Sequence, residues 1–224
     1  REGGKRKCPF ELEADEGMFQ RWKRLRGMDA AAEFKKMVKK DVEFRGNQEQ
    51  AIEAIKTGVS QIVCVMPTGS GKSVLFMLPA WVEPGGTTIV VVPLVALRKD
   101  MIRRCEELGI SCASWESRMP PDGVSIVLVT PESAVSDDFK SFIMRLKVTC
   151  QLDRVVIDEC HVILNEQRDF RINLQRLGQL VMAETQMVLL TATLPPSKEG
   201  VLWERMGWVA KDVKTFRVAT VRKN

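Results

Sequence analysis

The sequence predicts an α/β fold, a mostly parallel sheet with helices on both faces, preceded by a helical N-terminal segment. Short apolar, β-branched runs alternate with stretches of helical character along most of the chain. One such run, residues 62–65, leads into a turn with two glycines and then a helix. Another, residues 154–157, ends in the adjacent carboxylates Asp158 and Glu159. Parallel strands with polar residues at their ends indicate a ligand site at the carboxyl edge of the sheet.

Composition sets outer limits on size, partner and compartment. The chain has 224 residues, 45% of them hydrophobic, which is enough for one domain with a full core. Its net charge of +5 suits a polyanionic partner without proving one. The six cysteines form no C-x-x-C pair, so free thiols in a reducing compartment are expected. No apolar run reaches the roughly 20 residues of a membrane span, so the expectation is a soluble, intracellular protein.

Residues 1–42 differ from the rest and are expected to form a helical N-terminal extension. Phe19, Trp22 and Leu25 lie at helical spacing, and their side chains are expected to pack in the core rather than to form a ligand site. Asp29 is placed to cap a second helix that runs through Lys40.

Residues 61–74 predict a strand, a phosphate-binding loop and the start of a helix. Glycines let the backbone curl so that successive N–H groups face an anion at the helix N-terminus. Lys72 supplies a positive charge for the β- and γ-phosphates, and the Ser73 hydroxyl is placed to bind Mg²⁺. The usual first glycine of the pattern is Met66 here. The expected ATP-binding residues of the loop are Pro67, Thr68, Gly69, Ser70, Gly71, Lys72 and Ser73.

Further strands are expected along the chain, at residues 88–92, 110–115, 124–129, 186–190 and within 207–224. The last of these is expected to run into a linker. Basic residues follow the strand that ends at Pro93, at the start of a predicted helix.

The carboxylates Asp158 and Glu159 form the second predicted chemical centre. Asp158 is expected to hold Mg²⁺ through water, and Glu159 to polarise the attacking water. His161, the only histidine, and the hydroxyls of Thr191 and Thr193 are candidates for coupling nucleotide state to other groups. Ordinary capping and turn chemistry is the alternative for the threonines.

Gln48 opens a predicted helix upstream of the loop, three residues after Arg45 and four after Phe44. A glutamine amide carries a donor and an acceptor that match adenine N6–H and N7. The spacing alone does not settle whether Gln48 reads a base or is simply a polar residue at a helix start.

Together, residues 66–73, Asp158-Glu-Cys-His161 and Thr191-Ala-Thr193 resemble the ordered motifs of a superfamily 2 helicase. The finer resemblance is to the RecQ family of DNA helicases, over residues 40 to 224. It implies a RecA-like P-loop domain in which Phe44, Arg45 and Gln48 bind adenine. The DNA contacts that it implies are Pro93, Leu94, Arg98, Lys99, Thr130, Arg168 and Arg171.

The resemblance also implies the function and the organisation of the chain. Residues 43–210 would be the ATP-binding lobe of a 3′–5′ DNA helicase that uses ATP and Mg²⁺ and moves on single-stranded or partly duplex DNA. Residues 211–224 would lead toward a second lobe in a longer parent chain, and the compartment would be the nucleus. That second lobe would supply an arginine that stabilises the transferring phosphate.

Three residues depart from the family pattern, and two of them concern the sensing of DNA. Cys160 stands where the family usually has alanine, a small-for-small change. Glu166 and Arg168 stand where its aromatic-rich loop has tryptophan and histidine, which changes the stacking role of that loop. Two alternatives therefore stay open: an RNA helicase lobe, or a nucleotide-gated DNA-binding module without helicase activity.

Overall fold

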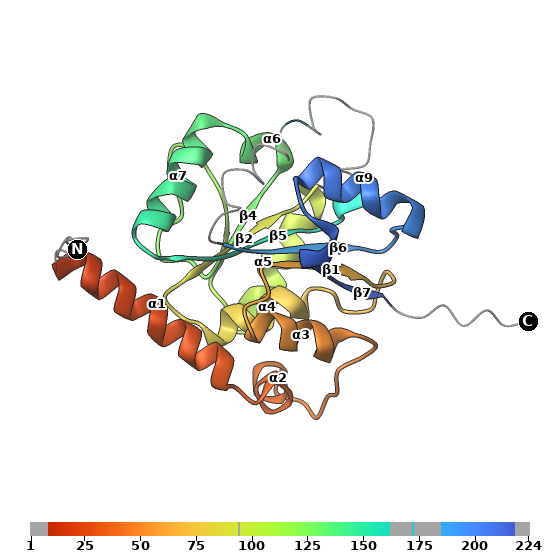
Figure 1. Ribbon diagram of the computed structural model, residues 1–224. Coiled ribbons are helices and arrows are strands. Elements are labelled where there is room, and N and C mark those ends of the chain that lie inside the picture. Colours follow the sequence, from red (N-terminus) through yellow and green to blue (C-terminus); the bar gives the residue numbers. More distant parts are fainter. Residues whose placement is uncertain (1–8, 94, 162–171, 173–184, 218–224) are drawn as a thin grey trace, which may run out of the picture.

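The computed structural model describes residues 9–93, 95–161, 172 and 185–217 (Figure 1). Two helices, α1 (Pro9–Gly27) and α2 (Ala30–Val38), precede the α/β part of the chain. The strands of that part are β1 (Gln61–Val65), β2 (Thr87–Val91), β3 (Cys112–Ser114), β4 (Ile126–Val129), β5 (Leu152–Ile157), β6 (Gln186–Thr191) and β7 (Val213–Arg217). Its helices are α3 (Gln48–Lys56), α4 (Val74–Val82), α5 (Val95–Glu107), α6 (Pro131–Ala134), α7 (Asp137–Val148) and α9 (Pro196–Met206), with a 3-10 turn at Ala210–Asp212.

All seven strands join one sheet in the order β3-β4-β2-β5-β6-β1-β7, and every pairing is parallel. The predicted α/β fold with a parallel sheet is therefore confirmed. β7 pairs with β1 and lies beyond residue 210, so the sheet extends into the range that the sequence assigns to a linker. The predicted domain boundaries themselves stay a prediction.

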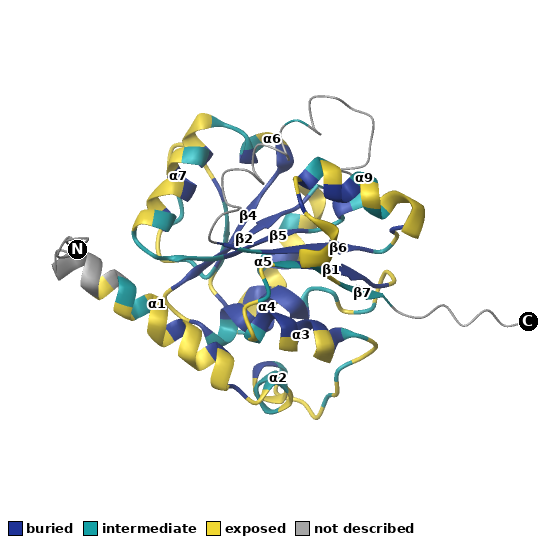
Figure 2. Cartoon of the chain, in the orientation of Figure 1, coloured by how far each residue is buried: buried dark blue, intermediate teal, exposed yellow. Residues whose placement is uncertain are grey.

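Two hydrophobic layers sandwich the sheet, because alternate residues of each strand point to opposite faces. One layer packs residues of α1 to α5 against one face, and the other packs α6, α7 and α9 against the opposite face (Figure 1). The central strands and α4 are almost entirely buried, as Figure 2 shows in dark blue. Their continuous apolar runs are what a parallel sheet covered on both faces requires.

The N-terminal helices pack on the first layer through Leu25, Met28 and Met37. Asp29 caps α2 as expected, since its side chain accepts from the amide of Ala32. The expectation that Phe19 and Trp22 lie in the core is wrong: their exposed fractions are 50% and 43%. Only every third or fourth position of a surface helix faces the core, and on α1 that stripe runs through buried Arg21 and Leu25.

Arg21 ties α1 to the amino-terminal edge of the sheet. Its guanidinium donates to Asp153 Oδ1 at 3.0 and 3.1 Å and to the carbonyl of Cys150 at 2.5 Å. Beside it, Arg154 donates to Glu83 at 2.6 Å, to Thr88 at 3.3 Å and to Gln186 at 3.1 Å. Burial raises the pKa of both carboxyl groups, Glu83 and Asp153, although the two arginines oppose the rise.

Cys64, Cys105, Cys112 and Cys160 are free thiols, as expected from the spacing of the cysteines. Cys64 lies in β1, and burial raises the pKa of its thiol to about 12. A thiol with so high a pKa carries almost no thiolate near neutral pH, so Cys64 is an inert core residue. No described helix is long and apolar enough to cross a membrane.

Candidate nucleotide-binding site

The loop between β1 and α4 has the backbone that a phosphate cradle needs. Gly69 and Gly71 take φ angles of 78° and 77°, a region that favours glycine. At Gly71 a side chain would also collide with its surroundings, because a Cβ there would lie 2.8 Å from Gln48 Nε2. The loop therefore needs glycine at position 71 for its conformation, and a side chain there would displace the end of the Gln48 side chain.

Several polar groups of the loop have no partner among the described residues. The amides of Gly69, Gly71, Lys72 and Ser73 donate no hydrogen bond there, and the Ser70 hydroxyl is buried without a partner. Such groups are costly unless something accepts their hydrogen bonds. A run of free amides at the start of a helix fits an anion, so the loop fits a nucleotide phosphate chain.

Lys72 and Glu159 meet across the carboxyl edge of the sheet. Lys72 Nζ lies 3.0 Å from Glu159 Oε1, in a partly buried ion pair. Glu159 has a φ of 52°, which is unusual for a residue other than glycine. The sharp turn after β5 thus turns Glu159 toward the phosphate loop, 87 residues earlier in the chain.

Asp158 lies beside Glu159 and is mostly buried. Its amide donates to Val91 O at 3.0 Å, which continues the β2–β5 ladder, and its Oδ1 accepts from the amide of Glu159 at 2.9 Å. Burial raises the pKa of the Asp158 carboxyl group, and the neighbouring Glu159 charge raises it further, against the opposing charge of Lys72. A cation near Asp158 would relieve both effects.

His161 and Thr191 extend this set of contacts away from the carboxylates. His161 Nδ1 lies 3.2 Å from Glu159 Oε2 and 3.3 Å from Thr191 Oγ1. The Thr191 hydroxyl also donates to Thr193 O at 3.0 Å and accepts from the amide of Thr193. All three predicted coupling residues therefore lie in one chain of contacts that ends at Glu159.

Gln48 contacts the phosphate loop through the nitrogen of its amide and Arg45 through the oxygen. Its Nε2 donates to the carbonyls of Ser70 and Gly71 at 2.7 and 3.1 Å, and its Oε1 accepts from the amide of Arg45 at 2.8 Å. Only 3% of Gln48 is exposed. To bind adenine through N7 as predicted, its amide must release at least one of these loop carbonyls.

A pocket of about 680 Å³ opens between this glutamine and the phosphate loop. Phe34 and Phe44 stack on one another in its wall, with ring centroids 4.9 Å apart. The predicted site residues that line it are Phe44, Arg45, Gln48, Gly69, Ser70, Gly71 and Ser73. Its volume and its mixture of apolar walls with convergent polar groups are typical of a small-ligand site.

Arg104 is a site residue that the sequence analysis missed. From α5 its Nη2 donates to Ser73 Oγ at 2.9 Å, so the hydroxyl predicted to bind Mg²⁺ faces a guanidinium here. A basic residue in an ordinary surface helix carries no sequence signal for this role, because the contact spans 31 residues. No group of three or more His, Cys, Asp or Glu residues that could hold a metal ion occurs in the described chain. Mg²⁺ in nucleotide sites takes few protein ligands, so Ser73 and Asp158 still fit it.

The predicted DNA contacts are only partly described. Pro93 and Arg98 are half-buried, and Lys99 is exposed on α5. Thr130 is buried and caps α6 by accepting from the amide of Ser133 at 3.3 Å. The residues that lie outside the described part of the chain are Leu94, Glu166, Arg168 and Arg171.

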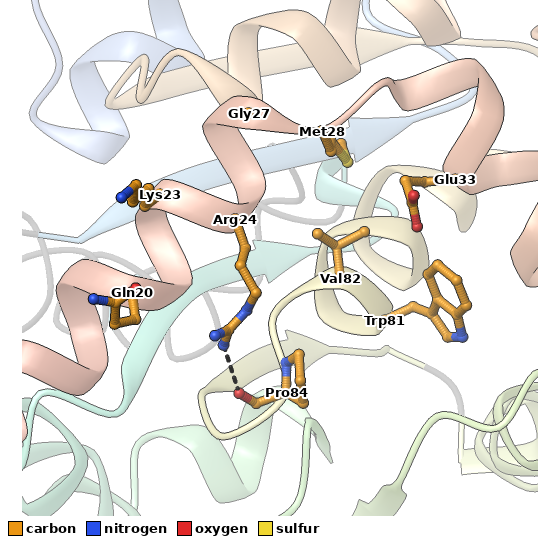
Figure 3. A pocket seen from close by; sticks show the side chains of 9 residues that line it. All are labelled: Gln20, Lys23, Arg24, Gly27, Met28, Glu33, Trp81, Val82 and Pro84. Atoms are coloured by element: carbon orange, nitrogen blue, oxygen red, sulfur yellow. Dashed lines mark hydrogen bonds between the residues drawn. The ribbon is translucent and has the colours of Figure 1, made fainter.

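A second pocket, of about 660 Å³, lies between α1, α2 and the end of α4 (Figure 3). Lys23, Arg24 and Trp81 contribute to its walls, and Arg24 donates to the carbonyl of Pro84. None of its lining residues belongs to the predicted site. The chemistry argued above therefore belongs to the pocket beside the phosphate loop.

Comparison with solved structures supports the fold. The chain is similar to the DUF1998 helicase MrfA bound to DNA, with a TM-score of 0.65 and 19% identity over 84% of this chain and 30% of that one. It is also similar to Dbp5 L327V from S. cerevisiae bound to RNA and ADP BeF3, with a TM-score of 0.62 and 17% identity over 95% of this chain and 50% of that one. These likenesses establish a helicase-type α/β fold.

Named proteins similar to this chain include ATP-dependent helicases, one of them a RecQ. The chain is 33% identical over 168 residues to ATP-dependent helicase SGS1 of Saccharomyces cerevisiae, which covers 67% of this chain and 12% of that protein. It is 32% identical over 168 residues to ATP-dependent DNA helicase RecQ of Bacillus subtilis, which covers 68% and 28%. The chain thus spans less than a third of the length of either relative. Residues 45–200 match the DEAD/DEAH box helicase family. The chain therefore belongs to the DEAD/DEAH box helicases, and RecQ helicases are among its relatives.

Proposed function

We propose that this chain is the ATP-binding lobe of a RecQ-like 3′–5′ DNA helicase. The observation that carries the proposal is the phosphate loop with its unpaired amides, placed against the Lys72–Glu159 pair. The lobe would couple binding and hydrolysis of ATP to movement on single-stranded or partly duplex DNA, and its compartment would be the nucleus. The named relatives support the DNA helicase assignment over an RNA helicase lobe.

Each residue of the site has a role in this proposal. The amides of the loop and the Lys72 ammonium hold the β- and γ-phosphates. Ser73 and Asp158 hold Mg²⁺, which neutralises charge that builds on the transferring phosphate. When the nucleotide binds, Lys72 leaves Glu159 and pairs with a phosphate instead. Glu159 is then free to accept a proton from the attacking water. Gln48 contacts the loop and lines the proposed adenine pocket, so it links the position of the loop to the binding of adenine.

Coupling to DNA runs through His161 and the threonines in this proposal. When Glu159 changes partner, the contact from its Oε2 to His161 changes with it, and His161 passes the change to Thr191 on β6. Pro93, Leu94, Arg98, Lys99, Thr130, Arg168 and Arg171 remain the proposed DNA contacts. The buried Thr130 side chain caps α6 and its carbonyl accepts from the amide of Ala134 at 2.9 Å, so Thr130 also positions α6.

Isothermal calorimetry with Mg²⁺–ATP and Mg²⁺–ADP tests the nucleotide assignment. The chain is expected to bind both, and Lys72→Ala is expected to weaken ATP binding by about 100-fold or more, since it removes a charged phosphate partner. Lys99→Ala, on the exposed face of α5, serves as a control for loss of a lysine near the same sheet edge. Equal ATP affinity in the wild type and Lys72→Ala would overturn the assignment.

Turnover provides a separate test. Without the arginine of a second lobe, an omission worth about 10³–10⁵ in rate in related enzymes, this chain alone should hydrolyse ATP very slowly and unwind nothing. Steady-state phosphate release and a strand-separation assay measure the two activities. Robust unwinding by the chain alone would contradict the proposal.

A further inference from the structure

Arg104 forms no ion pair with a carboxylate in the described part of the chain, although, after a hydrogen bond from Arg103, its charge also helps to lower the pKa of Asp100 on the same helix. Its guanidinium donates a hydrogen bond to the Ser73 hydroxyl. Its neighbour Arg103 differs completely: it bonds to Asp100 at 2.5 Å and to Glu107 at 3.1 Å on the same helix. Of these two adjacent arginines, only Arg104 reaches the phosphate loop.

The position of Arg104 points to an anionic ligand. It lines the same pocket of about 680 Å³ as Gly69, Gly71 and Ser73. A guanidinium beside unpaired loop amides makes this corner strongly favourable for negative charge. The planar fork of arginine also matches the oxygens of a phosphate, which a single hydroxyl does not use fully.

The contact with Ser73 is also incompatible with a metal at the same hydroxyl. A Ser73 oxygen that binds Mg²⁺ has a cation on one side, and like charges repel at such a distance. Arg104 therefore has to leave Ser73 when the metal enters, and its exposed, flexible side chain permits this movement. The nearest anions available to it would then be the phosphates held by the loop.

From this geometry we infer that Arg104 is an additional phosphate-binding residue of the nucleotide site. It holds the Ser73 hydroxyl in the free protein and pairs with the nucleotide phosphates in the complex. Without metal its guanidinium supplies part of the positive charge that Mg²⁺ otherwise provides. The inference rests on the proposed function, since it requires that the loop bind a nucleotide.

ADP binding measured by calorimetry in EDTA and again in Mg²⁺ tests this role. Arg104→Gln is expected to lower the affinity for ADP in EDTA by about tenfold, the usual loss for a charge-assisted hydrogen bond. In saturating Mg²⁺ the loss should be smaller, because the metal carries the counter-charge. Arg104→Lys keeps the charge and should recover part of the affinity. Arg103→Gln is the matched control and should bind ADP like the wild type.

The thermal midpoint of each ligand-free variant separates binding from folding. A purely structural Arg104 would lower the midpoint and leave the ratio of ADP affinities with and without Mg²⁺ unchanged. That result, or ADP affinity in EDTA equal to or above that of the wild type, overturns the inference. If the wild type binds ADP and Lys72→Ala does not, an unchanged Arg104→Gln overturns this inference alone. A wild type that binds no ADP overturns the proposed function as well.

Discussion

Charged residues have different surroundings at the two edges of the parallel sheet, and β5 has charged residues at or next to both of its ends. Near its start Arg154 is bonded to Glu83, and both residues are almost fully buried, at 2% and 4% exposed. Directly after its end, Asp158 and Glu159 lie beside a loop in which four amides have no partners among the described residues. At the amino edge the charged groups neutralise one another, whereas at the carboxyl edge backbone amides stay without partners among the described residues.

This difference separates a structural site from a functional one. At the amino edge Arg154 donates hydrogen bonds from all three guanidinium nitrogens, and Arg21 donates from two of them, so both charges have protein partners. The carboxyl edge keeps four loop amides without partners among the described residues, an Arg104 that forms no ion pair there, and a strained φ at Glu159. Unsatisfied groups and strain of this kind are usual at binding sites. Removing side chains should therefore cost stability at one edge and binding at the other.

The largest effect on stability is expected at the amino edge. Arg154→Met leaves the Glu83 carboxyl group buried without its partner and should lower the free energy of unfolding by about 3–5 kcal/mol. The double variant Arg154→Met with Glu83→Leu removes both charges and should recover much of that loss. Urea unfolding measures both. A loss below about 1 kcal/mol would mean that this pair behaves like a surface ion pair.

A smaller loss is expected for the phosphate loop. Gly71→Ala imposes a side chain at a φ of 77° and against Gln48, and should lower the free energy of unfolding by about 1–2 kcal/mol for the backbone strain alone. Gly58→Ala is the matched control, because its φ is 78° and no atom lies within 4 Å of a Cβ there. If Gly71→Ala lowers the free energy of unfolding more than Gly58→Ala does and also weakens nucleotide binding, the contact with Gln48 accounts for the difference. Equal losses would show that strain is the whole effect.

Lys72→Ala tests the opposite side of the comparison. The Lys72–Glu159 pair is partly exposed, so its removal should change the free energy of unfolding by less than about 1 kcal/mol. The same variant should lose the stabilisation that Mg²⁺–ATP gives the wild type, because binding to the folded state alone raises stability. Thermal unfolding with and without nucleotide measures both quantities. A large loss of stability without nucleotide would make this pair a structural feature like Arg154–Glu83.

The smallest effect is expected from Asp158→Asn, and it should be a gain. The raised pKa means that folded Asp158 holds its proton more tightly than the unfolded chain does. The stability that this carboxyl group contributes is therefore fully present below the ordinary carboxyl pKa. It is lost as the pH rises through the raised pKa of the folded state. At pH 7 the ionised carboxylate destabilises the fold, and asparagine removes that penalty.

Urea midpoints at pH 4 and pH 7 check this sign. The advantage of Asp158→Asn over the wild type should be larger at pH 7 than at pH 4. Asp41 is the control, because its exposed carboxyl group has a pKa lowered by a hydrogen bond from Lys35. Asp41→Asn should give a small change of the opposite sign. An Asp158→Asn variant less stable than the wild type at pH 7 would show that its carboxylate supports the fold.

Much of the carboxyl edge could be predicted because its signals are local. A β-branched run, two glycines and Gly-Lys-Ser specify a strand, a turn and a helix start within 14 residues, and β1 and α4 lie where the sequence places them. Asp158 and Glu159 follow β5 for the same reason. The parallel order of strands then requires both loops to meet at one edge.

The sequence by itself therefore determined the parallel α/β fold, the phosphate loop and the carboxylate pair, through patterns that span a few residues each. The tertiary structure decided which side chains meet across long stretches of chain. It set Arg104 against Ser73, buried Arg154 with Glu83, and left Phe19 and Trp22 exposed. Helical spacing shows which residues share a face of the helix, but not which face is turned toward the core. The sequence also does not show whether an arginine pairs with a residue of its own helix or contacts another segment. Only packing of the helices on the sheet resolves these choices, because their free energies come from neighbours distant in the chain.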